Sequence, residues 1–399
     1  MDAFYASVEL LRYPELRGAA VVIGGGRRHQ PLARADGTRE FAVLRDYTGR
    51  GVATTATYAA RAHGVSSGMG LMKAAMLAPD AVLLPTDFER YRHYSRLFKA
   101  AVAEVAPLIE DRGIDEIYID LTDVPGAQEA VAHAPHGGVR AVAQSIRNSV
   151  RRATGLSCSI GITPNKLLSK IASELDKPDG LTLLTEADVE TRIWPLAVRK
   201  INGIGPKASA RLATLGIETV GELARADAGL LLEHFGRSFG AWLHAAAHGR
   251  DERPVVTHSE PVSMSRETTF ERNLHAVRDR AELSAIFTEL CRQVAGDLAR
   301  KGYVGKTIGI KLRFDDFKTV TRDHTLAAAT ADSALVRRIA GECLRRVDLS
   351  RRLRLLGVRV GSLSRADAAA RPPRTAQPGA APGPSALREA PASLPLFEP

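Results

Sequence analysis

The segment Gly113-Ile114-Asp115-Glu116-Ile117-Tyr118-Ile119-Asp120 places two adjacent carboxylates at the start of a short alternating pattern. Polar and apolar residues alternate from position 116 to 121, which predicts a β-strand with one apolar face. Two carboxylates at one end of a strand repel each other unless a cation lies between them. Mg2+ is held by one or two carboxylates and completes its shell with phosphates and water. Asp115 and Glu116 therefore form a candidate metal site, with a solvated acidic turn as the alternative.

The chain has 399 residues and a formal net charge of +10. This length allows two to four domains. Residues 301–362 hold fourteen Lys and Arg but only six Asp and Glu. A local excess of positive charge favours an anionic polymer such as nucleic acid as the partner, with a solvated basic face as the alternative.

The three cysteines, Cys158, Cys291 and Cys343, are far apart in sequence and lack metal-ligand spacing. Their pattern is typical of buried thiols in a reducing compartment. No apolar run approaches the roughly 18 residues that a membrane span needs, and no basic leader precedes an apolar segment. We therefore expect a cytoplasmic protein without membrane contact.

Helical spacing of apolar residues over 90–108 and 139–153 alternates with strand candidates at 81–85, 116–121 and 156–162. No glycine-rich nucleotide fingerprint accompanies them. This pattern predicts an α+β core with helices on one face of a sheet. Residues 26–50 are polar and irregular, and we expect an extended surface loop there.

The acidic strand and the first residues, Met1–Glu9, together resemble the palm of the Y-family DNA polymerases, most closely the bacterial DNA polymerase IV group. We read Met1–Glu9 as a strand that runs into a helix. Further segments match in the family's order over roughly residues 1–362, and they lie at 53–61, 159–166, 177–180 and 201–205.

This resemblance implies an α+β multidomain protein with the architecture of a right-hand polymerase. The expected domains are a palm, fingers, a helical thumb with a helix-hairpin-helix, and a ferredoxin-like little finger. Their expected boundaries are 1–10 and 88–176 for the palm, 11–87 for the fingers, 177–245 for the thumb with its hairpin at 200–223, 246–256 for a tether, 257–362 for the little finger and 363–399 for a disordered tail.

The resemblance makes Asp115 and Glu116 two of the three carboxylates that hold two Mg2+ ions during nucleotidyl transfer. The residue matching Met1 contributes its backbone carbonyl, and the third carboxylate lies immediately before it. Asp2 matches an aspartate that is not a principal ligand. We therefore expect the sequence as given to bind DNA but to extend primers poorly, and we expect an aspartate added directly before Met1 to restore synthesis.

The incoming deoxynucleoside triphosphate is assigned by the same resemblance to Thr55, Tyr58, Arg61 and Lys177. Arg61 and Lys177 would neutralise the phosphates, and the two hydroxyls would orient them. Tyr5 matches the steric gate, an aromatic ring that collides with a ribose 2′-hydroxyl. A core aromatic residue and solvated basic residues are the alternatives.

Primer-template DNA is the expected macromolecular substrate. Gly203 and Gly205 belong to a hairpin whose backbone amides can bind phosphate, although such hairpins also occur in DNA glycosylases and ligases. Alternation predicts that Lys311 and Arg313 share one face of a strand, and that Arg352 and Arg354 share a face of a later strand. All four cations are expected to contact DNA.

The C-terminal peptide Ser393–Pro399 resembles the short segment with which many bacterial polymerases hold the sliding clamp. Leu394, Leu396 and Phe397 would supply its apolar anchors. A random disordered end is the alternative, since such peptides are brief.

The sequence thus predicts a monomeric DNA-templated DNA polymerase acting in low-fidelity translesion synthesis. Two alternatives remain open. One is a catalytically impaired, polymerase-like DNA-binding protein that lacks the first metal aspartate. The other is a helix-hairpin-helix DNA repair enzyme, which would leave the palm motifs unexplained.

Overall fold

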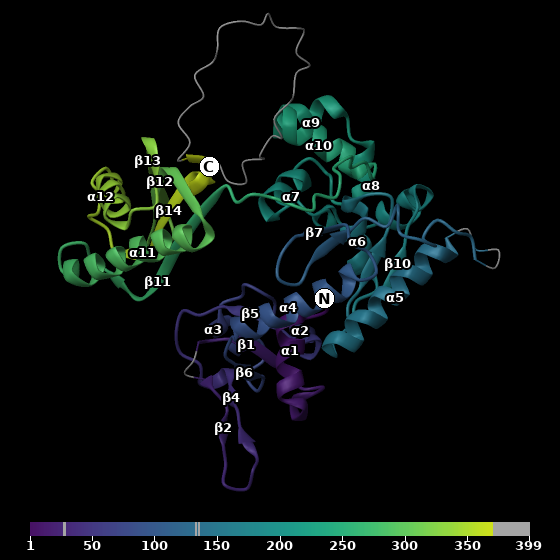
Figure 1. The fold of residues 1–399 in the computed structure, drawn as a ribbon, viewed down its shortest axis with the longest axis horizontal. Coiled ribbons are helices and arrows are strands. Elements are labelled where there is room, and N and C mark those ends of the chain that lie inside the picture. The colour runs from purple at the N-terminus through teal and green to yellow at the C-terminus, as the bar shows by residue number, and fades with distance from the viewer. Residues whose placement is uncertain (27–28, 132–133, 135, 370–399) are drawn as a thin grey trace, which may run out of the picture. The chain divides into compact units, whose positions relative to one another are not determined.

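The computed structural model describes residues 1–26, 29–131, 134 and 136–369 (Figure 1). These residues form two compact units, which divide between Glu260 and Pro261. In the part of the chain that the structure describes, no helix is long and apolar enough to cross a membrane.

A four-stranded sheet forms the centre of the predicted fingers. Its order is β4 (Ala42–Val43), β6 (Val82–Leu84), β1 (Val21–Gly24) and β5 (Ala53–Ala56). Strand β1 is antiparallel to β5 and parallel to β6. All four residues of β1 are buried, because α2 (Tyr58–Ala62), α3 (Leu71–Leu77) and the N-terminal helix contribute to the surrounding cores.

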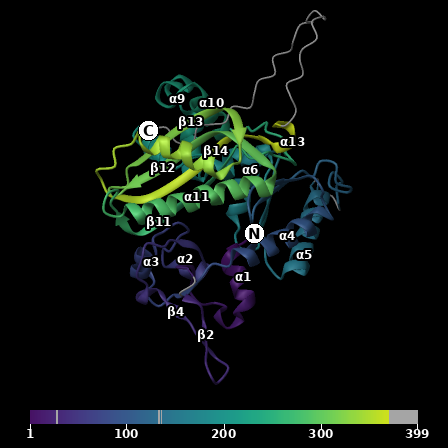
Figure 2. The same cartoon turned by 60° about the vertical axis from the view of Figure 1, so that its left-hand side comes forward.

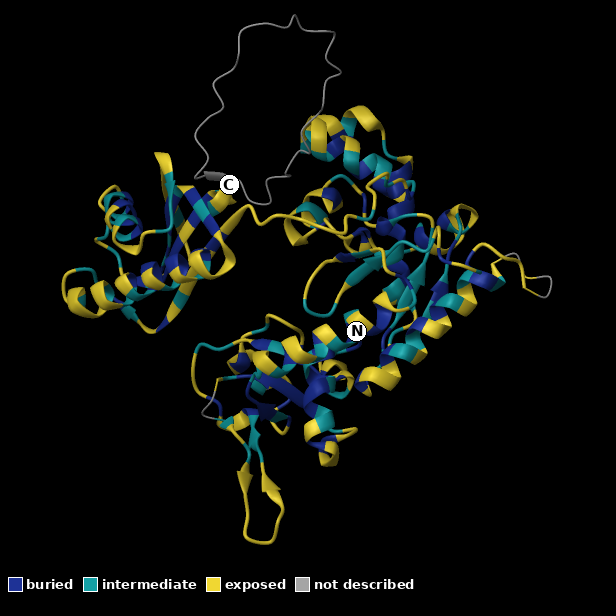
Figure 3. Cartoon of the chain, viewed as in Figure 1, coloured by how far each residue is buried: buried dark blue, intermediate teal, exposed yellow. Residues whose placement is uncertain are grey.

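The expectation of an irregular loop over 26–50 is wrong for its described residues. Strands β2 (Leu32–Ala33) and β3 (Arg39–Glu40) form an exposed hairpin, and β4 joins the main sheet (Figure 3). The hairpin is short and solvated on both faces, so it lacks the apolar alternation that reveals a strand in sequence.

The predicted palm contains two separate two-stranded sheets and three long helices. Strand β7 (Ile109–Asp111) pairs with β8 (Ile117–Ile119), and β9 (Ile160–Ile162) pairs with β10 (Leu181–Leu183). The helices are α4 (Phe88–Ala103), α5 (Gly137–Thr154) and α6 (Lys166–Leu175). Figure 2 shows α4 and α5 side by side.

Helix α1 (Phe4–Arg12) begins almost at the N-terminus. The strand that we predicted before it does not form among residues 1–3. Met1 and Asp2 each make one backbone hydrogen bond, to Asp115 and Ser157 respectively, and one bond to each neighbour is too few for a strand.

Small helices make up the predicted thumb, and their amphipathic faces enclose a separate core. They are α7 (Pro206–Ala213), α8 (Val220–Arg225), α9 (Ala228–Phe235) and α10 (Arg237–Ala247). Short helical turns occur at Pro14–Leu16, Leu44–Asp46, Glu186–Asp188, Val189–Ile193 and Val198–Lys200.

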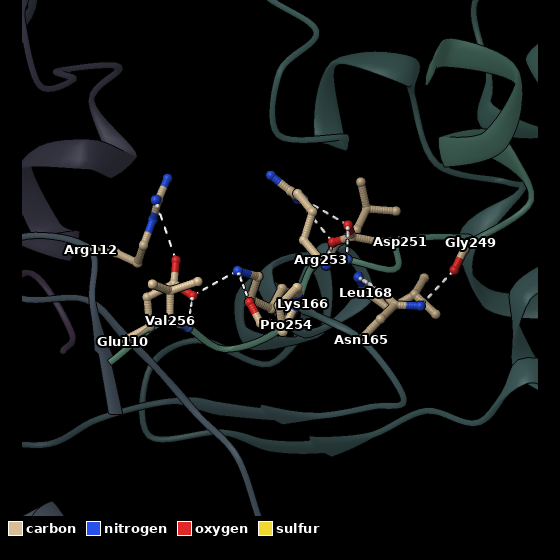
Figure 4. A network of polar contacts seen from close by, with 11 residues as sticks. Glu110, Arg112, Asn165, Lys166, Leu168, Gly249, Asp251, Arg253, Pro254 and Val256 are labelled. Carbon is tan, nitrogen blue, oxygen red and sulfur yellow. Dashed lines mark hydrogen bonds and ion pairs between the residues drawn. The ribbon is translucent and has the colours of Figure 1, made fainter. Parts of the chain in front are cut away.

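The segment after α10 is fastened to the palm by a buried ion pair (Figure 4). Lys166 Nζ lies 2.6 Å from a carboxylate oxygen of Glu110 and also donates to the carbonyl of Pro254. The amide of Val256 donates to the same carboxylate at 2.9 Å. Burial alone would raise the pKa of Glu110, but these bonds hold it below its usual value. The predicted tether is therefore exposed along much of its surface yet anchored.

The second unit is an antiparallel sheet covered on one face by two helices. The chain order is β11 (Ser263–Leu274), α11 (Arg280–Lys301), β12 (Tyr303–Phe314), β13 (Thr319–Thr330), α12 (Ser333–Leu344), β14 (Leu353–Arg365) and α13 (Ala366–Ala369). The sheet order is β11-β14-β12-β13. The order of elements along the chain, β-α-β-β-α-β, is the one expected for the predicted ferredoxin-like domain.

The prediction that residues 363–365 belong to a disordered tail is wrong. Residues 363–365 continue β14 and pair with Tyr303–Gly305 of β12. Backbone pairing extends the strand here although the sequence is already turning polar.

Candidate active site

Asp115 and Glu116 lie in the turn that leads into β8, beside the N-terminus. Asp115 is half-buried and Glu116 is exposed. The ammonium group of Met1 donates to the backbone carbonyl of Asp115 at 2.8 Å. Burial raises the pKa of the Asp115 carboxyl; the Met1 ammonium opposes this effect, and the Glu116 carboxylate adds to it. The two carboxylates are thus like charges close together, an arrangement that a cation would stabilise.

Two lysines from the region of α6 supply positive charge next to this pair. Lys170 forms an ion pair with Glu116 and lies 3.5 Å from Glu174. Glu174 in turn pairs with Lys177 at 2.6 Å. Burial alone lowers the pKa of Lys170, but its bond with Glu116 and the adjacent Glu174 raise it overall.

Sequence reasoning found Lys177 but missed Lys170. Its signal was available, since Lys170 and Glu174 stand four residues apart just after the matched segment 159–166, a spacing that places them side by side on a helix. Lys170 is part of the site because it pairs with Glu116. Glu116 is 54 residues away in sequence, so this pairing could not be identified from spacing.

One cavity of about 1150 Å³ gathers part of the predicted site. The site residues that line it are Met1, Asp115, Glu116, Lys170 and Lys177. Tyr5, Thr55, Tyr58 and Arg61 do not line this cavity, and they form two further clusters.

The buried carboxylate of Asp2 connects three segments of the palm by hydrogen bonds. It is 2% exposed, and its carboxylate accepts hydrogen bonds from the hydroxyls of Ser157 and Ser159 at 2.9 and 2.8 Å. A third bond comes from the amide of Asp179 at 2.9 Å. Through these contacts, Asp2 anchors the N-terminus to the strands of the palm.

The first of the two clusters joins β5 to α2. The guanidinium of Arg61 donates to the carbonyl of Ala56 at 3.0 Å and to the hydroxyl of Thr55 at 3.3 Å. The same guanidinium lies 5.0 Å from the centre of the Tyr58 ring. Burial raises the pKa of Tyr58, and the negative charges of Asp2 and Glu174 contribute to this rise. The structure therefore groups three predicted triphosphate ligands, with the hydroxyl of Tyr58 in the field of the palm's carboxylates.

The second cluster surrounds Tyr5 on α1. Its ring lies 4.4 Å from that of Tyr91 and 5.9 Å from that of Phe88, measured between centroids. Burial raises the pKa of Tyr5, with a further contribution from the charge of Asp115. A rigid aromatic ring therefore stands near the candidate metal site.

The donor set of the acidic pair suits a hard divalent ion. Within the described residues, no three His, Cys, Asp or Glu side chains cluster so as to enclose a metal. Asp115 and Glu116 nevertheless supply the one or two carboxylates with which Mg2+ is usually held beside substrate phosphates. The ion pair of Glu116 with Lys170 shows that the site already attracts positive charge.

The predicted hairpin has the geometry that a backbone phosphate contact needs. Gly203 has a φ of 115°, and a Cβ there would lie 2.7 Å from Trp242, so only glycine fits. Gly205 precedes α7, and Pro206 occupies its first turn. Among the described residues, leaving out its two chain neighbours, no heavy atom comes within 4 Å of the position of a Cβ at Gly205, so the helix start is open.

The sheet face of the second unit that is opposite its helices combines cations with hydroxyls. Lys311 pairs with Glu267 at 2.9 Å, and Arg313 donates to Thr319 at 3.1 Å. Arg359, which the sequence analysis missed, stands opposite Gly309 on the same face. Its separation from Lys311 in sequence hid this neighbourhood.

The expectation that Arg352 and Arg354 share one face of a strand is wrong. Arg352 precedes β14, and the register shifts where Arg313 pairs with Leu355 but Phe314 pairs with Leu353. Arg354 is left between the two pairs and lies 4.6 Å from the centre of the Phe317 ring. A bulge of this kind redirects one side chain and leaves little trace in the sequence. The predicted clamp residues Leu394, Leu396 and Phe397 lie outside the described residues.

Three parts of the chain match one protein family. The impB/mucB/samB family matches residues 1–174, its C-terminal domain matches residues 261–372, and the IMS family HHH motif matches residues 186–217. These segments contain the acidic pair, the basic sheet and the start of the hairpin region.

Curated relatives resemble the chain over nearly its whole length. "DNA polymerase IV" of Streptomyces coelicolor is 38% identical over 91% of this chain and 70% of its own length. "DNA polymerase IV" of Alkalilimnicola ehrlichii is 36% identical over 91% of this chain and 93% of its own length.

A solved structure, "Y-family DNA polymerase chimera Dbh-Dpo4(243-245)-Dbh", is similar in fold with a TM-score of 0.74. It covers 90% of this chain and 96% of its own at 23% identity. "Insertion ternary complex of Dbh DNA polymerase" is similar over the same shares with a TM-score of 0.59.

Proposed function

Because this chain belongs to the impB/mucB/samB family of Y-family DNA polymerases, we propose a residue-level account of how it copies DNA. The chain is a DNA-directed DNA polymerase of the translesion type. The observation that carries the account is the acidic pair Asp115 and Glu116, which lines one cavity together with Lys170 and Lys177. The repair-enzyme alternative is not supported, since the similarity extends through the palm.

Asp115, Glu116 and the carbonyl of Met1 would hold the divalent ions, which we propose are two Mg2+. Bound there, such ions would lower the barrier of nucleotidyl transfer by stabilising charge on the attacking and leaving oxygens. The contribution of the chain is to keep the two carboxylates adjacent, with Asp115 half-buried and Glu116 exposed. Lys170 stabilises Glu116 electrostatically, and it must release this carboxylate when a metal ion takes its place.

Arg61 and Lys177 neutralise the triphosphate, and Thr55 and Tyr58 orient it by hydrogen bonding. The bond between Arg61 and Thr55 supports this division, because it holds the guanidinium in a fixed direction before substrate arrives. Tyr5 excludes a ribose 2′-hydroxyl. Its packing against Tyr91 supports that role, because a steric gate excludes a substrate only if its ring cannot move aside.

Primer-template DNA contacts the backbone at Gly203 and Gly205 and the side chains of Lys311 and Arg313. Arg352 and Arg354 remain proposed contacts, from the start of β14 rather than from the face of the sheet. Such phosphate contacts fix the position of a duplex without reading its sequence.

The C-terminal peptide with Leu394, Leu396 and Phe397 binds a sliding clamp in this proposal. The protein otherwise acts as a monomer in the cytoplasm, where its DNA substrate lies. Deleting residues 393–399 should remove stimulation by the clamp but preserve unassisted synthesis, because a tethered peptide docks without touching the active site. Equal stimulation with and without the peptide would exclude this role.

A primer-extension assay with a template lesion tests the whole proposal. With Mg2+ and an aspartate added directly before Met1, we expect template-dependent synthesis across the lesion. Removal of Mg2+ by a chelator should stop synthesis while a gel-shift assay still detects DNA binding. DNA cleavage or base excision in place of synthesis would contradict the proposal.

A further inference from the structure

The loop that carries Lys177 is bound by two arginines of α5. Lys177 follows α6, and the loop ends at Gly180, directly before β10. The carboxylate of Asp179 in this loop accepts a hydrogen bond from Arg147 at 2.7 Å and forms an ion pair with Arg151. Because Arg147 and Arg151 stand four residues apart on one helix, both reach the same carboxylate.

The backbone of the same loop is fixed to the palm strands. The amide of Asp179 donates to the carboxylate of Asp2 at 2.9 Å, and that of Gly180 donates to the hydroxyl of Ser159 at 3.1 Å. The carbonyl of Gly180 accepts from the amide of Ile160 at 3.0 Å. The loop is therefore fastened to the start of β9 through its backbone and to α5 through Asp179.

The conformation of the loop requires this support. Asp179 has a φ of 58°, in the left-handed region that is uncommon outside glycine even though aspartate tolerates it. A Cβ at Gly180 would lie 2.3 Å from the carbonyl oxygen of Asp176, so only glycine fits the tight turn that follows. Such a backbone persists only where the surrounding contacts determine it.

Arg147 is the buried member of the arginine pair. Its side chain is 16% exposed, compared with 55% for Arg151. One terminal nitrogen of Arg147 donates both to the carboxylate and to the backbone carbonyl of Asp179, and the other donates to Gln144 at 2.9 Å. One guanidinium thereby fixes the side chain and the backbone of a single loop residue.

The burial of Arg147 has a cost that packing alone does not explain. Its Nε atom is buried and, among the described residues, has no hydrogen-bond partner. A buried donor without a partner lowers stability, and an apolar residue at this position would avoid the loss. The arginine is therefore better explained by its contacts with Asp179 than by the packing of α5.

The electrostatics of the contact favour an ion pair that persists at neutral pH. Burial alone would raise the pKa of the Asp179 carboxyl, but Arg147 and Arg151 hold it below its usual value. Because an exposed ion pair contributes little, Arg151 supports the contact and Arg147 is its main part.

Lys177 lies two residues before Asp179, so the loop determines where its side chain starts. Its Nζ atom lies 2.6 Å from Glu174, and Lys177 lines the cavity that contains Asp115 and Glu116. A lysine side chain has a flexible four-carbon stem and can adopt many directions. A fixed loop backbone reduces this freedom before a nucleotide binds, which lowers the cost of binding.

We propose that Arg147 is a positioning residue for Lys177. By holding Asp179, it fixes the loop so that the amine of Lys177 is kept at the site of the triphosphate. This inference rests on the proposed role of Lys177 in nucleotide binding, and Arg147 acts only through the loop.

The first test measures the position of Lys177 without any substrate. Amines of the full chain are labelled with N-hydroxysuccinimidyl acetate, and the labelling rate of each lysine is measured by mass spectrometry. Arg147→Met keeps an unbranched side chain but removes the bonds to Asp179. It should raise the labelling rate of Lys177 at least about threefold, because local opening frees the amine from Glu174, while Lys73 on α3 keeps its rate.

Hydrogen exchange at the amide of Asp179 should also become at least about tenfold faster in Arg147→Met. Arg152→Met is the matched control, since Arg152 lies on the same helix and donates to the hydroxyl of Ser149 at 3.1 Å. Asp179→Asn, which removes the charge that the arginines bind, is the second variant in case Arg147→Met fails to fold, and it should also raise the labelling rate of Lys177. Labelling and exchange equal to those of Arg152→Met would overturn the proposal.

The second test measures nucleotide binding on a primer that ends in a dideoxynucleotide, with Mg2+ present. Arg147→Met should weaken binding of the correct deoxynucleoside triphosphate about tenfold in the unaltered chain but less than about twofold in Lys177→Ala, because both changes remove one interaction. An equal loss in both backgrounds would overturn the proposal, since a merely structural role does not depend on Lys177. If Lys177→Ala alone leaves nucleotide binding unchanged, the proposed function of Lys177 fails, and the labelling test still decides whether Arg147 positions this residue.

Discussion

The acidic pair of the palm and the basic sheet face of the second unit use charge in opposite ways. Asp115 is half-buried and Glu116 is exposed, and Glu116 forms an ion pair with Lys170. Lys311, Arg313 and Arg359 are exposed or partly exposed cations spread over a regular sheet, each with its own polar partner. A site that performs chemistry therefore depends on individual residues, whereas a surface that follows phosphates depends on their sum.

The largest effect is expected when one carboxylate of the acidic pair is removed. Asp115→Ala or Glu116→Ala should reduce primer extension by about 1000-fold or more, because the ligands of a catalytic metal support several kcal/mol of transition-state stabilisation. Extension is measured in the form with an aspartate added before Met1, and DNA binding by fluorescence anisotropy.

Asp120→Ala is the matched control for the carboxylate variants. Its carboxylate accepts from the amide of Thr122 at 2.9 Å and lies on the same strand segment. It should retain most of its activity. Near-normal extension by Asp115→Ala or Glu116→Ala would contradict the role of these carboxylates as ligands of a catalytic metal.

The second test concerns the cations that serve the triphosphate. Arg61→Ala and Lys177→Ala should each lower kcat/KM for a correct deoxynucleotide by about 10- to 100-fold, because a charged hydrogen bond contributes about 1.5–3 kcal/mol. Lys73→Ala on the exposed side of α3 is the control, measured in the same single-turnover assay. A loss no larger than that of Lys73→Ala would show that these cations act only through total charge.

The prediction for Tyr5 concerns shape rather than charge. Tyr5→Ala should lower the preference for deoxynucleotides over ribonucleotides by about 30-fold, since a clash of a few atoms contributes about 2 kcal/mol. Tyr5→Phe keeps the ring and its packing on Tyr91 and should keep the preference. If both variants retain the preference with normal activity, Tyr5 is a packing residue alone.

The smallest effect is expected on the basic sheet. Replacing Lys311 and Arg313 together by alanine should reduce the log-log salt slope of DNA binding by up to about two, equally for all duplex sequences. The control is Arg338→Ala. Arg338 lies on α12, which covers the opposite face of the sheet, and it pairs with Glu342. A sequence-selective loss of affinity would contradict phosphate tracking.

The same contrast explains what the sequence revealed. Helices with regular apolar periodicity were predicted well: the segments 90–108 and 139–153 correspond to α4 and α5. The acidic pair was visible because its two members are adjacent. Lys170 was missed because its role depends on Glu116, to which only the fold brings it.

Irregular backbone was the other limit of prediction. The hairpin β2–β3 has no apolar face, and the bulge at Arg354 depends on how β14 pairs with β12. The predicted N-terminal strand is a different case, because Met1 and Asp2 each make one backbone hydrogen bond to a neighbouring segment, which is too few for a strand. Local propensity alone cannot supply tertiary pairing.

The most direct measurement of the central claim is metal binding without chemistry. On a primer that ends in a dideoxynucleotide, with the correct deoxynucleotide present, bound Mn2+ can be counted by electron paramagnetic resonance. We predict that Asp115→Asn weakens Mn2+ binding at least about tenfold, because a neutral amide replaces a charged hard ligand, while Arg338→Ala leaves it unchanged. Equal Mn2+ affinity in Asp115→Asn and the unaltered chain would contradict the assignment of the acidic pair as the metal site.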